Sequence, residues 1–478
     1  MNARPPNFTQ VTGLQRDSPF PQHGRSRAVV IGASVAGMST ARVLADHFER
    51  VTVVERDAID GDEFRPGVPQ GRQVHALLRG GSEVLERLFP GFEAQLLGRG
   101  ARSVYWAREI RWWHFGGWKG AHDSEFASVA CSRFLVEDTI RRRLREWPII
   151  EFVDGVRVET LIADEERNSV RGVRLDDGRV LEADLVVDAS GRSSRAPEWL
   201  RALGFNPPAE TVVTSFLGYA SRLYRRPTRR IDWTGLLIYP TPPKSNRGGV
   251  IFPIEGDRWH VILVGVGREY PPTDPDEFMA FAKSLLVPDL HKAIVAAEPL
   301  SPIYGYRNTE NRLRHFDRLP RYLERFVVLG DAACCFNPVY GQGMTTAALS
   351  AELLGSCIRQ AKGGPLMVAR TFQRRLGKLL SVPWTLATSE DFRYPTTEGG
   401  RATPLTRMLQ RYVDGVIRLG VRDVAAYDAF WQVLHMCKPP ASLLAPRLLM
   451  RVLAGIAASR RSPSAESEPP SNANHLDD

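Results

Sequence analysis

Short apolar runs alternate with helical spacing in the first part of the chain. Ala28–Ile31 is an apolar run of strand length, and Val51–Val54 is a second one. Between them, apolar residues follow the 3.6-residue period of a helix, at Met38, Ala41, Leu44, Ala45 and Phe48. This order predicts a strand, a helix and a second, parallel strand. Leu185–Asp188 and Phe326–Leu329 predict two more buried strands.

The middle and the end of the chain have other patterns. From about Thr211 to Gly267, apolar and polar positions alternate, and Gly248–Pro253 and Trp259–Val266 are typical of neighbouring antiparallel strands. Asp274 to Ala297 has helical spacing, as do most of residues 366–460, with a proline- and glycine-rich interruption around 395–405. The whole pattern predicts an α/β fold with an inserted antiparallel sheet and a helical C-terminal region.

These patterns also predict the division of the chain into parts. Residues 1–26 and 461–478 are polar and proline-rich, and we expect both to be disordered. The α/β domain is expected to be discontinuous, with segments 27–100, 130–205 and 310–365. The antiparallel-sheet domain is expected to take residues 101–129 and 206–309, and the helical region residues 366–460.

The first predicted strand leads into a glycine-rich turn. Gly32 would make the tight turn, the small Ser34 would let the backbone approach a pyrophosphate, and Gly37 would let the helix pack closely on the strand. The helix N-terminus would add free N–H groups and a positive dipole end. Glu55, after the second strand, is placed to accept hydrogen bonds from a ribose. A strand–helix turn without a ligand is the alternative, but the complete unit with its terminal acid favours a dinucleotide site.

Composition narrows the class of protein. At 478 residues, with 43% hydrophobic and 24% charged residues, the chain can form two or three globular domains. It has no uncharged apolar run of about 18 residues, and its N-terminus lacks the apolar core of a secretory signal. The five cysteines show neither metal-ligand spacing nor a disulfide framework. We therefore expect a cytoplasmic protein without a metal site.

The net charge of +9 has several explanations. The arginines are dispersed and no nucleic-acid-binding motif is found, so a nucleic-acid partner is not expected. Attraction to anionic cofactors or to a membrane surface remains open, as does an ordinary basic protein. The arginine-bearing amphipathic stretch Leu443–Ala458 predicts either peripheral contact with lipid or a helix packed on the main body.

A second glycine-rich stretch changes the expected cofactor from a nicotinamide to a flavin dinucleotide. Asp331 follows a strand and could bind a ribitol hydroxyl, while Pro338, Gly341 and Gly343 would let the backbone approach a flat ring. A helix from about Gly343 would direct its N–H groups at that ring and stabilise negative charge on a reduced flavin. A simple connection is the alternative, but the first unit beside it favours flavin.

Four motifs follow one another along the chain. They are GASVAG at 32–37 with Glu55, RPGVPQ at 65–70, DASGRSSRAPEWL at 188–200 and GDAACCFNPVYGQGMTTA at 330–347. In this order, they resemble FAD-dependent monooxygenases of the para-hydroxybenzoate hydroxylase fold, over roughly residues 27–365. The resemblance implies a Rossmann-like FAD-binding domain, with the antiparallel sheet as the substrate domain. Within this group, RPGVPQGRQVHALL at 65–78, FPIEGDRW at 252–259 and the helical C-terminus are most similar to flavin epoxidases of polyether biosynthesis.

The resemblance implies a set of FAD-binding residues. They are Gly32, Ala33, Ser34, Ala36, Gly37, Glu55, Arg56, Arg65, Val68, Arg133, Val158, Asp331, Pro338, Gly341, Gln342, Gly343 and Met344. The first turn would hold the pyrophosphate and Glu55 the adenosine ribose. Backbone near Val158 would touch adenine, and the backbone at Val68 and at 341–344 would touch the flavin ring. Arg65 and Arg133 would approach the cofactor, with surface ion pairs as the alternative.

The implied activity is oxygen transfer. Reduced FAD would take up O₂ as a C4a-hydroperoxide and pass one oxygen atom to a lipophilic alkene, polyene or aromatic substrate, in secondary metabolism. Epoxidation is slightly favoured over aromatic hydroxylation because it needs no catalytic base. His75 is the one candidate base, with a structural histidine as the alternative. The aromatic residues at 104–129 either wall an apolar substrate cavity or pack the sheet on its neighbour.

The electron source and the type of reaction stay open at this point. NAD(P)H would supply electrons directly or through a partner flavin reductase, and the spacing Asp188-Ala189-Ser190-Gly191 departs from the Asp-Gly of hydroxylases that bind NADPH themselves. The alternatives to a monooxygenase are a flavin-dependent reductase of the geranylgeranyl reductase type and a non-catalytic flavoprotein. The Trp-x-Trp-x-Ile-Pro element of flavin halogenases is missing. Cys334-Cys335 is interpreted as packing in preference to redox chemistry.

Overall fold

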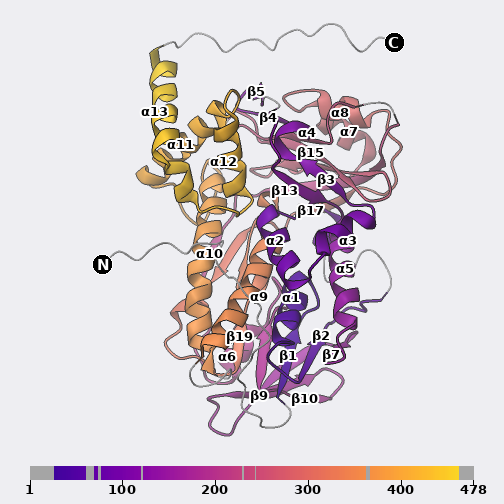
Figure 1. Ribbon diagram of the computed structural model, residues 1–478, viewed down its shortest axis with the longest axis vertical. Coiled ribbons are helices and arrows are strands. Elements are labelled where there is room, and N and C mark those ends of the chain that lie inside the picture. The colour runs from indigo at the N-terminus through magenta and orange to yellow at the C-terminus, as the bar shows by residue number, and fades with distance from the viewer. Residues whose placement is uncertain are drawn as a thin grey trace.

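The computed structural model describes residues 26–60, 69–73, 77–119, 122–228, 231–242, 244–361 and 367–461. The segments predicted to be disordered, 1–26 and 461–478, lie outside these residues except for Ser26 and Arg461. Figure 1 shows an elongated molecule, with the parallel sheet in its lower part and the antiparallel sheet and the C-terminal helices side by side above. None of the helices within the described ranges combines the length and the apolar character needed to cross a bilayer.

A five-stranded parallel sheet forms the centre of the lower part. Its strand order is β19-β11-β1-β2-β7, and its strands are β1 (Arg27–Ile31), β2 (Arg50–Val54), β7 (Ile150–Val153), β11 (Leu185–Asp188) and β19 (Phe326–Val328). The four strands predicted from apolar runs are therefore confirmed. Their Val and Ile side chains are buried because α1 (Val35–Leu44), α5 (Arg133–Arg145) and α9 (Gly343–Gln360) share one core with the sheet.

A seven-stranded sheet forms the second layer. Its order is β17-β13-β16-β15-β14-β4-β5, with strands β4 (Ile110–His114), β5 (Gly117–Trp118), β13 (Gly218–Arg225), β14 (Gly235–Ile238), β15 (Arg247–Ile254), β16 (Arg258–Gly265) and β17 (Tyr304–Tyr306). The predicted antiparallel pair is β15 and β16, in which Val250 faces Ile262. β4 joins the sheet beside β14, so residues near 110 complete a layer that is otherwise built from residues 218–306.

The stretch from Asp274 to Ala297, which has helical spacing, forms two short helices. They are α7 (Pro275–Lys283) and α8 (Asp289–Ile294). The break has a local cause: α7 ends at Lys283 with Ser284 as its C-cap, and Pro288, which has no N–H group to donate, comes directly before α8.

Smaller elements connect the two layers. The helices are α2 (Arg79–Leu88), α3 (Phe92–Gly98), α4 (Trp106–Glu109) and α6 (Ala196–Ala202). The small sheets are β3 (Arg102–Tyr105) with β6 (Ala127–Ala130), β8 (Val158–Ala163) with β9 (Val170–Leu175) and β10 (Val180–Glu182), and β12 (Glu210–Val213) with β18 (Asn311–Arg314) and β20 (Cys334–Cys335). Short 3-10 turns cover Pro69–Arg72, Phe316–Arg318, Gly330–Ala332, Pro338–Tyr340 and Pro440–Leu444.

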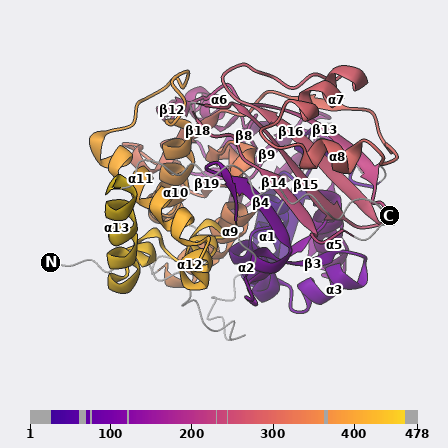
Figure 2. The same ribbon diagram turned by 90° about the horizontal axis from the view of Figure 1, so that it is seen from above.

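The C-terminal region is helical, as predicted. It consists of α10 (Ala369–Asp391), α11 (Pro404–Leu419), α12 (Val424–Leu434) and α13 (Pro446–Arg461), and residues 392–403 form the predicted interruption. α10 packs along α9, whereas α12 lies against α4, next to the antiparallel sheet. Figure 2 shows α13 at the outer side of this group. The predicted fold, an α/β domain with an inserted antiparallel sheet and a helical C-terminus, is confirmed.

Candidate functional site

A cavity of about 1010 Å³ lies where the parallel sheet, the antiparallel sheet and the C-terminal helices meet. Ligand pockets are usually about 300–1,000 Å³, so this one suits a large ligand or two smaller ones. One part is lined by the ends of β1, β2 and the Gly330–Ala332 turn. The other part is lined by aromatic and aliphatic side chains of the antiparallel sheet and of α12.

The turn from β1 to α1 can be made only with glycines at two positions. Gly32 has φ +104°, and a Cβ atom added there would lie 2.5 Å from the carbonyl oxygen of Ala189 on the neighbouring strand end. A Cβ atom added at Gly37 would lie 1.7 Å from the carbonyl oxygen of Gly32. The helix is therefore packed as tightly on the strand as the sequence predicted, and its N-terminus meets the cavity.

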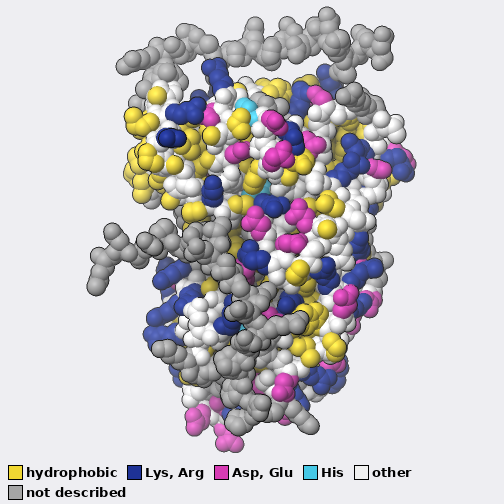
Figure 3. All heavy atoms as spheres, in the orientation of Figure 1, with side chains coloured by type: hydrophobic (Ala, Val, Ile, Leu, Met, Phe, Trp, Pro, Cys, Tyr) yellow, Lys and Arg dark blue, Asp and Glu magenta, His cyan; other side chains and the backbone are white. Residues whose placement is uncertain are grey.

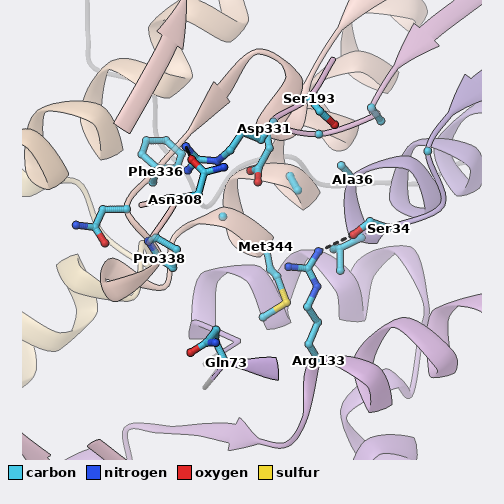
Figure 4. Close-up of a pocket in the computed structure, with 18 of the residues that line it drawn as sticks. Ser34, Ala36, Gln73, Arg133, Ser193, Asn308, Asp331, Phe336, Pro338 and Met344 are labelled. Atoms are coloured by element: carbon cyan, nitrogen blue, oxygen red, sulfur yellow. Dashed lines mark hydrogen bonds between the residues drawn. The ribbon is translucent and has the colours of Figure 1, made fainter. Parts of the chain in front are cut away.

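The two glycine-rich stretches, some 300 residues apart in sequence, are in contact. A Cβ atom added at Gly330 would lie 2.8 Å from Cβ of Ala36, at the first turn of α1. A Cβ atom added at Gly343 would lie 3.8 Å from Oδ1 of Asp331. The N-terminus of α1, the carboxylate of Asp331 and the N-terminus of α9 are thus neighbours around one space, as Figure 4 shows for Ser34, Asp331 and Met344.

Both helices begin without a side-chain cap. Ser34 precedes α1 and Gln342 precedes α9, yet neither side chain accepts a hydrogen bond from its own helix. The Oε1 atom of Gln342 is buried and has no hydrogen-bond partner among the described residues. The first N–H groups of a helix have no intrahelical partners, and an anion satisfies them well. The cavity therefore offers two anion-binding helix ends, one at each glycine-rich motif.

Ser34 belongs to a polar cluster that the sequence did not fully predict. Its Oγ atom donates a hydrogen bond to Oε1 of Glu137 (2.7 Å) and accepts one from Nη2 of Arg133 (2.6 Å), which Figure 4 shows as a dashed line. Nε of Arg133 also donates to Oε1 of Glu137 (2.8 Å). Arg133, which lines the cavity, thus makes an ion pair with the buried Glu137 and not a surface ion pair. Glu137 was not predicted, although its i+4 spacing from Arg133 on a predicted helix was visible in the sequence.

Charged groups oppose one another at Asp331. Burial raises the pKa of its carboxyl group, and the guanidinium groups of Arg133 and Arg192 act in the opposite direction. Arg192 lines the cavity and is held by Glu310, whose Oε1 lies 3.0 Å from Nη1. Arg314 donates to the carbonyl oxygens of Ala332 (2.8 Å) and Arg192 (3.1 Å) and so joins the Asp331 turn to the Arg192 turn. Neither arginine was predicted.

Two acidic residues that end strands organise their own turns. Glu55 lines the cavity, and its Oε2 atom accepts a hydrogen bond from the N–H of Ala33 (2.7 Å). Asp188 is fully buried and accepts hydrogen bonds from the hydroxyl groups of Ser190 and Ser194, both at 2.5 Å. The Asp188 carboxylate therefore fixes the turn that carries Arg192.

The structure brings most of the predicted FAD-binding residues to one cavity. Those that line it are Gly32, Ser34, Ala36, Glu55, Arg56, Arg133, Val158, Asp331, Pro338, Gly341, Gly343 and Met344. Buried positions behind the lining are taken by Ala33, Gly37 and Gln342. Three predicted positions lie outside the described residues, namely Arg65, Val68 and the candidate base His75.

The apolar part of the cavity is walled by rings from three regions of the chain. Trp106 contacts Trp431 of α12, with ring centroids 4.4 Å apart, and Phe252 of β15 at 5.9 Å. Trp112, by contrast, packs inside the protein against Phe430 at 5.7 Å. Both interpretations of the aromatic stretch at 104–129 therefore apply, each to different residues. The wall residue Trp431 was not predicted.

Titratable side chains around the apolar part are neutral near pH 7. His435 lines it, its Nδ1 atom accepts a hydrogen bond from the N–H of Arg79 (3.1 Å), and burial lowers its pKa to about 3. Burial raises the pKa of Tyr239 to about 12 and that of Tyr219 well above its usual range. Cys335 does not line the cavity but precedes the lining residue Phe336; burial raises its pKa to about 11, so this thiol, which is not in a disulfide, stays protonated.

The loop between β20 and α9 is held from behind by a buried carboxylate of α10. Asp391 accepts hydrogen bonds from the hydroxyl group of Tyr340 (2.7 Å) and from Nδ2 of Asn311 (2.6 Å). Oδ1 of Asn311 in turn accepts one from the N–H of Asn337 (2.8 Å). Burial raises the pKa of Asp391 to about 6. The loop residues that line the cavity, Pro338 to Gly341, are thus positioned by the C-terminal region.

A family model described as "FAD binding domain" matches residues 25–364. This chain belongs to the FAD-binding domain family. Protein Rv3254 of Mycobacterium tuberculosis (strain ATCC 25618 / H37Rv) is 32% identical over 349 residues, which is 70% of this chain and 73% of that protein. Squalene monooxygenase SE1 of Panax ginseng is 25% identical over 359 residues, 70% of this chain and 59% of that protein.

Solved structures of flavoproteins share the fold. PqsL, a probable FAD-dependent monooxygenase from Pseudomonas aeruginosa, has a TM-score of 0.58 and 20% identity, covering 77% of this chain and 97% of that one. The flavin-dependent brominase Bmp2 has a TM-score of 0.63 and 15% identity, covering 91% of this chain and 100% of that one. At these identities the likeness concerns the fold alone. The predicted FAD-binding fold is confirmed.

The residues around the cavity fit FAD. The glycine turn at Gly32 leaves room for a pyrophosphate at the start of α1, and Arg133 supplies a cation beside it. The uncapped start of α9 and the loop at Pro338–Gly341 provide a second polar contact at the boundary with the aromatic wall. The cavity is therefore suited to a dinucleotide at its polar end and an apolar molecule at the other.

Proposed function

We propose that this protein is an FAD-dependent monooxygenase that inserts one oxygen atom from O₂ into a lipophilic organic substrate. One observation carries the proposal: the two glycine-rich motifs of the FAD fold line the same cavity as an aromatic chamber, by which we mean the apolar part walled by Trp106, Phe252 and Trp431. Bound FAD, once reduced, supplies the chemistry of O₂ activation. The probable FAD-dependent monooxygenase PqsL, which shares the fold, supports this activity.

The chain contributes electrostatics and exclusion of water. The N–H groups at the start of α9 stabilise negative charge beside them, and the 18-residue helix adds its dipole. Met344 and the loop at Pro338–Gly341 place the flavin end of the site next to the chamber. The rings of Trp106, Phe252 and Trp431 keep that chamber apolar and limit the entry of water.

We propose an alkene or polyene as the substrate and epoxidation as the reaction. Phenol hydroxylation benefits from a base. His435 and Tyr239, which line the apolar part of the cavity, are both neutral near pH 7, and this supports a reaction that needs no base. Squalene monooxygenase as a sequence relative supports an apolar polyene substrate. The similarity of residues 65–78 and 252–259 to flavin epoxidases of polyether biosynthesis supports the same reaction, in secondary metabolism.

We propose that electrons come from NAD(P)H through a partner flavin reductase. In hydroxylases that bind NADPH themselves, Asp-Gly stands at the motif that here contains Asp188, Ala189 and Ser190. The Asp188 carboxylate accepts hydrogen bonds from Ser190 and Ser194 and does not line the cavity. NADPH alone should therefore reduce the bound FAD slowly, and addition of a flavin reductase should restore the rate.

One experiment separates the proposed activity from its alternative. The purified FAD-loaded protein is reduced with a flavin reductase and NADPH and is then given a polyene and ¹⁸O₂. A monooxygenase gives a product with one ¹⁸O atom and consumes O₂ in step with product formation. A reductase of the geranylgeranyl reductase type gives a saturated product without O₂ uptake, and that result would contradict the proposal.

A further inference from the structure

Large apolar side chains are exposed mainly on the C-terminal helices. Of the twelve that are most exposed among the described residues, seven belong to the stretch from α11 to α13: Leu405, Met408, Leu409, Val424, Leu444, Met450 and Leu453. The exposed fraction reaches 68% for Met450 and 59% for Leu405. Single exposed apolar residues are normal in any protein, but a concentration of them marks an interaction site. Figure 3 shows hydrophobic side chains gathered over α11 and α13.

The exposed apolar residues of α11 continue a stripe that is buried further along the same helix. Tyr412 and Val416 are buried in a small core together with Val452 of α13. A Cβ atom added at Gly415 would lie 2.8 Å from Cγ1 of Val452, so the two helices pack closely there. Leu405 and Leu409 precede Tyr412 on the same face, at helical spacing, but they are exposed. The first two turns of α11 therefore present an apolar face that α13 does not cover.

Unpaired positive charge accompanies this face. Residues 401–461 contain ten Lys or Arg and three Asp, an excess of seven positive charges in a chain whose excess is nine. The three carboxylates already have partners, since Asp414 binds Arg393, Asp423 binds Arg451 and Asp428 binds Ser124. The side chains that stay exposed and have no ion-pair partner among the described residues include Arg407, Arg411 and Arg447.

A second cavity, of about 930 Å³, adds to the positive field beside α11. It is lined by Arg407, Arg411 and Arg418 of α11, by Arg401 of the preceding loop and by Trp113 of β4. Burial and the charge of Arg418 lower the pKa of the neighbouring Lys119 to about 8. The cavity thus places several guanidinium groups where a phosphate-bearing headgroup could be bound, next to the exposed apolar turns.

We propose that this C-terminal face, made of Leu405, Met408, Leu409, Met450 and Leu453 with Arg407, Arg411 and Arg447, docks on an anionic lipid bilayer. Its apolar side chains would enter the boundary between headgroups and acyl chains, and its arginines would bind lipid phosphates. The charge favours a bilayer over a second copy of this chain, since two copies would bring like charges together. The docking would make the bilayer the source of the lipophilic substrate. This statement about the substrate rests on the proposed function, whereas the docking itself does not.

Vesicle sedimentation tests the docking without any measurement of activity. The full-length FAD-loaded protein is mixed with vesicles of phosphatidylcholine alone, or of phosphatidylcholine with about a third phosphatidylserine. It should sediment with the anionic vesicles only. The double variant Arg407→Gln/Arg411→Gln should bind them about 25-fold more weakly, at about fivefold for each arginine. Met408→Glu/Leu453→Glu should abolish binding, because it places carboxylates at the acyl boundary.

Matched variants at the other surfaces serve as controls. Val180→Glu/Val295→Glu changes equally exposed apolar residues outside the face, and Arg171→Gln/Arg174→Gln removes two charges from β9. Both should bind anionic vesicles like the parent protein. Equal binding by all variants, no sedimentation with either vesicle, or a dimer in light scattering that Met408→Glu/Leu453→Glu dissociates would each overturn the proposal. If the parent protein binds anionic vesicles but does not oxygenate a polyene, that result would contradict the proposed function and leave the docking intact.

Discussion

At the scale of single residues, the cavity depends on buried polar side chains whose partners come from distant elements. Ser34, in the turn before α1, is hydrogen-bonded to Arg133 and Glu137 of α5, about 100 residues later in the sequence. A buried carboxylate without its cation would be costly, so each member of the cluster constrains the others. Arg133 has a second role as a positive charge near Asp331 and the start of α1.

We predict that Arg133→Gln weakens FAD binding about 10- to 100-fold. The substitution removes a charge-assisted hydrogen bond, worth about 1.5–3 kcal/mol, from the polar end of the cavity. Arg142→Gln is the matched control on the same helix, because Arg142 is 65% exposed and binds Asp138 away from the cavity. Titration of the apoprotein with FAD, followed by flavin fluorescence, should show a loss of affinity for the first variant only. If Arg133→Gln bound FAD as tightly as the parent protein, Arg133 would not contribute to FAD binding.

We predict a pH-dependent contribution of Asp391 to stability. Burial raises its pKa from 3.8 to about 6, so the folded state holds the proton more tightly than the unfolded state. Stability from this group is complete below pH 4 and is lost as the pH rises to about 6, on the order of 3 kcal/mol in total. Asp391→Asn cannot titrate, and its unfolding free energy should fall less over that range.

The measurement for Asp391 is urea unfolding at several pH values between 4 and 7. Asp177→Asn is a suitable control, since Asp177 lies in an exposed turn and accepts hydrogen bonds from Arg179 in the same turn. It should retain the steeper pH dependence of the parent chain. The same slope for the parent chain and Asp391→Asn would show that Asp391 is ionised throughout this range.

At the scale of elements, two helices are directed at one cavity by their starting turns. α1 begins directly after Ser34 because glycine at position 32 allows the turn, and α9 begins two residues after Gly341, which has φ +66°. The helices also pack on each other, so the N-terminus of one fixes the position of the other. This pairing gives two positive dipole ends the same target. It depends on the close packing of α1 on β1, which can be tested.

We predict that Gly37→Ala destabilises the protein by about 1–3 kcal/mol, because the added Cβ would overlap the carbonyl oxygen of Gly32 at 1.7 Å and force the backbone apart. Gly455→Ala is the matched control in α13, where an added Cβ meets no atom within 4 Å. This control should gain about 0.5–1 kcal/mol from helix propensity. Thermal unfolding of both variants should give shifts of opposite sign, and a tolerated Gly37→Ala would refute the tight packing.

At the scale of the whole molecule, local pattern predicted which residues meet at the glycine-rich end of the cavity but not all of those that wall its aromatic end. Gly32, Glu55 and Asp331 stand at strand ends inside recognisable strand–helix patterns, so their convergence followed from the fold. Trp431 reaches Trp106 across more than 300 residues, and Asp391 reaches Tyr340 from another helix. A helical stretch shows which residues share a face but not which distant surface that face meets. The C-terminal contribution therefore became visible only in three dimensions.

The last prediction concerns this long-range wall. Trp431→Phe shortens a ring that lines the chamber, and it should leave FAD affinity unchanged while more reduced flavin is lost to hydrogen peroxide, because water enters the enlarged space. Phe430→Leu is the control on the same helix, since Phe430 stacks on Trp112 and does not line the cavity. Peroxide released per NADPH should rise several-fold for Trp431→Phe and stay near the parent value for Phe430→Leu. Peroxide release that rises equally in both variants would mean that loosened packing, rather than the chamber wall, controls the access of water.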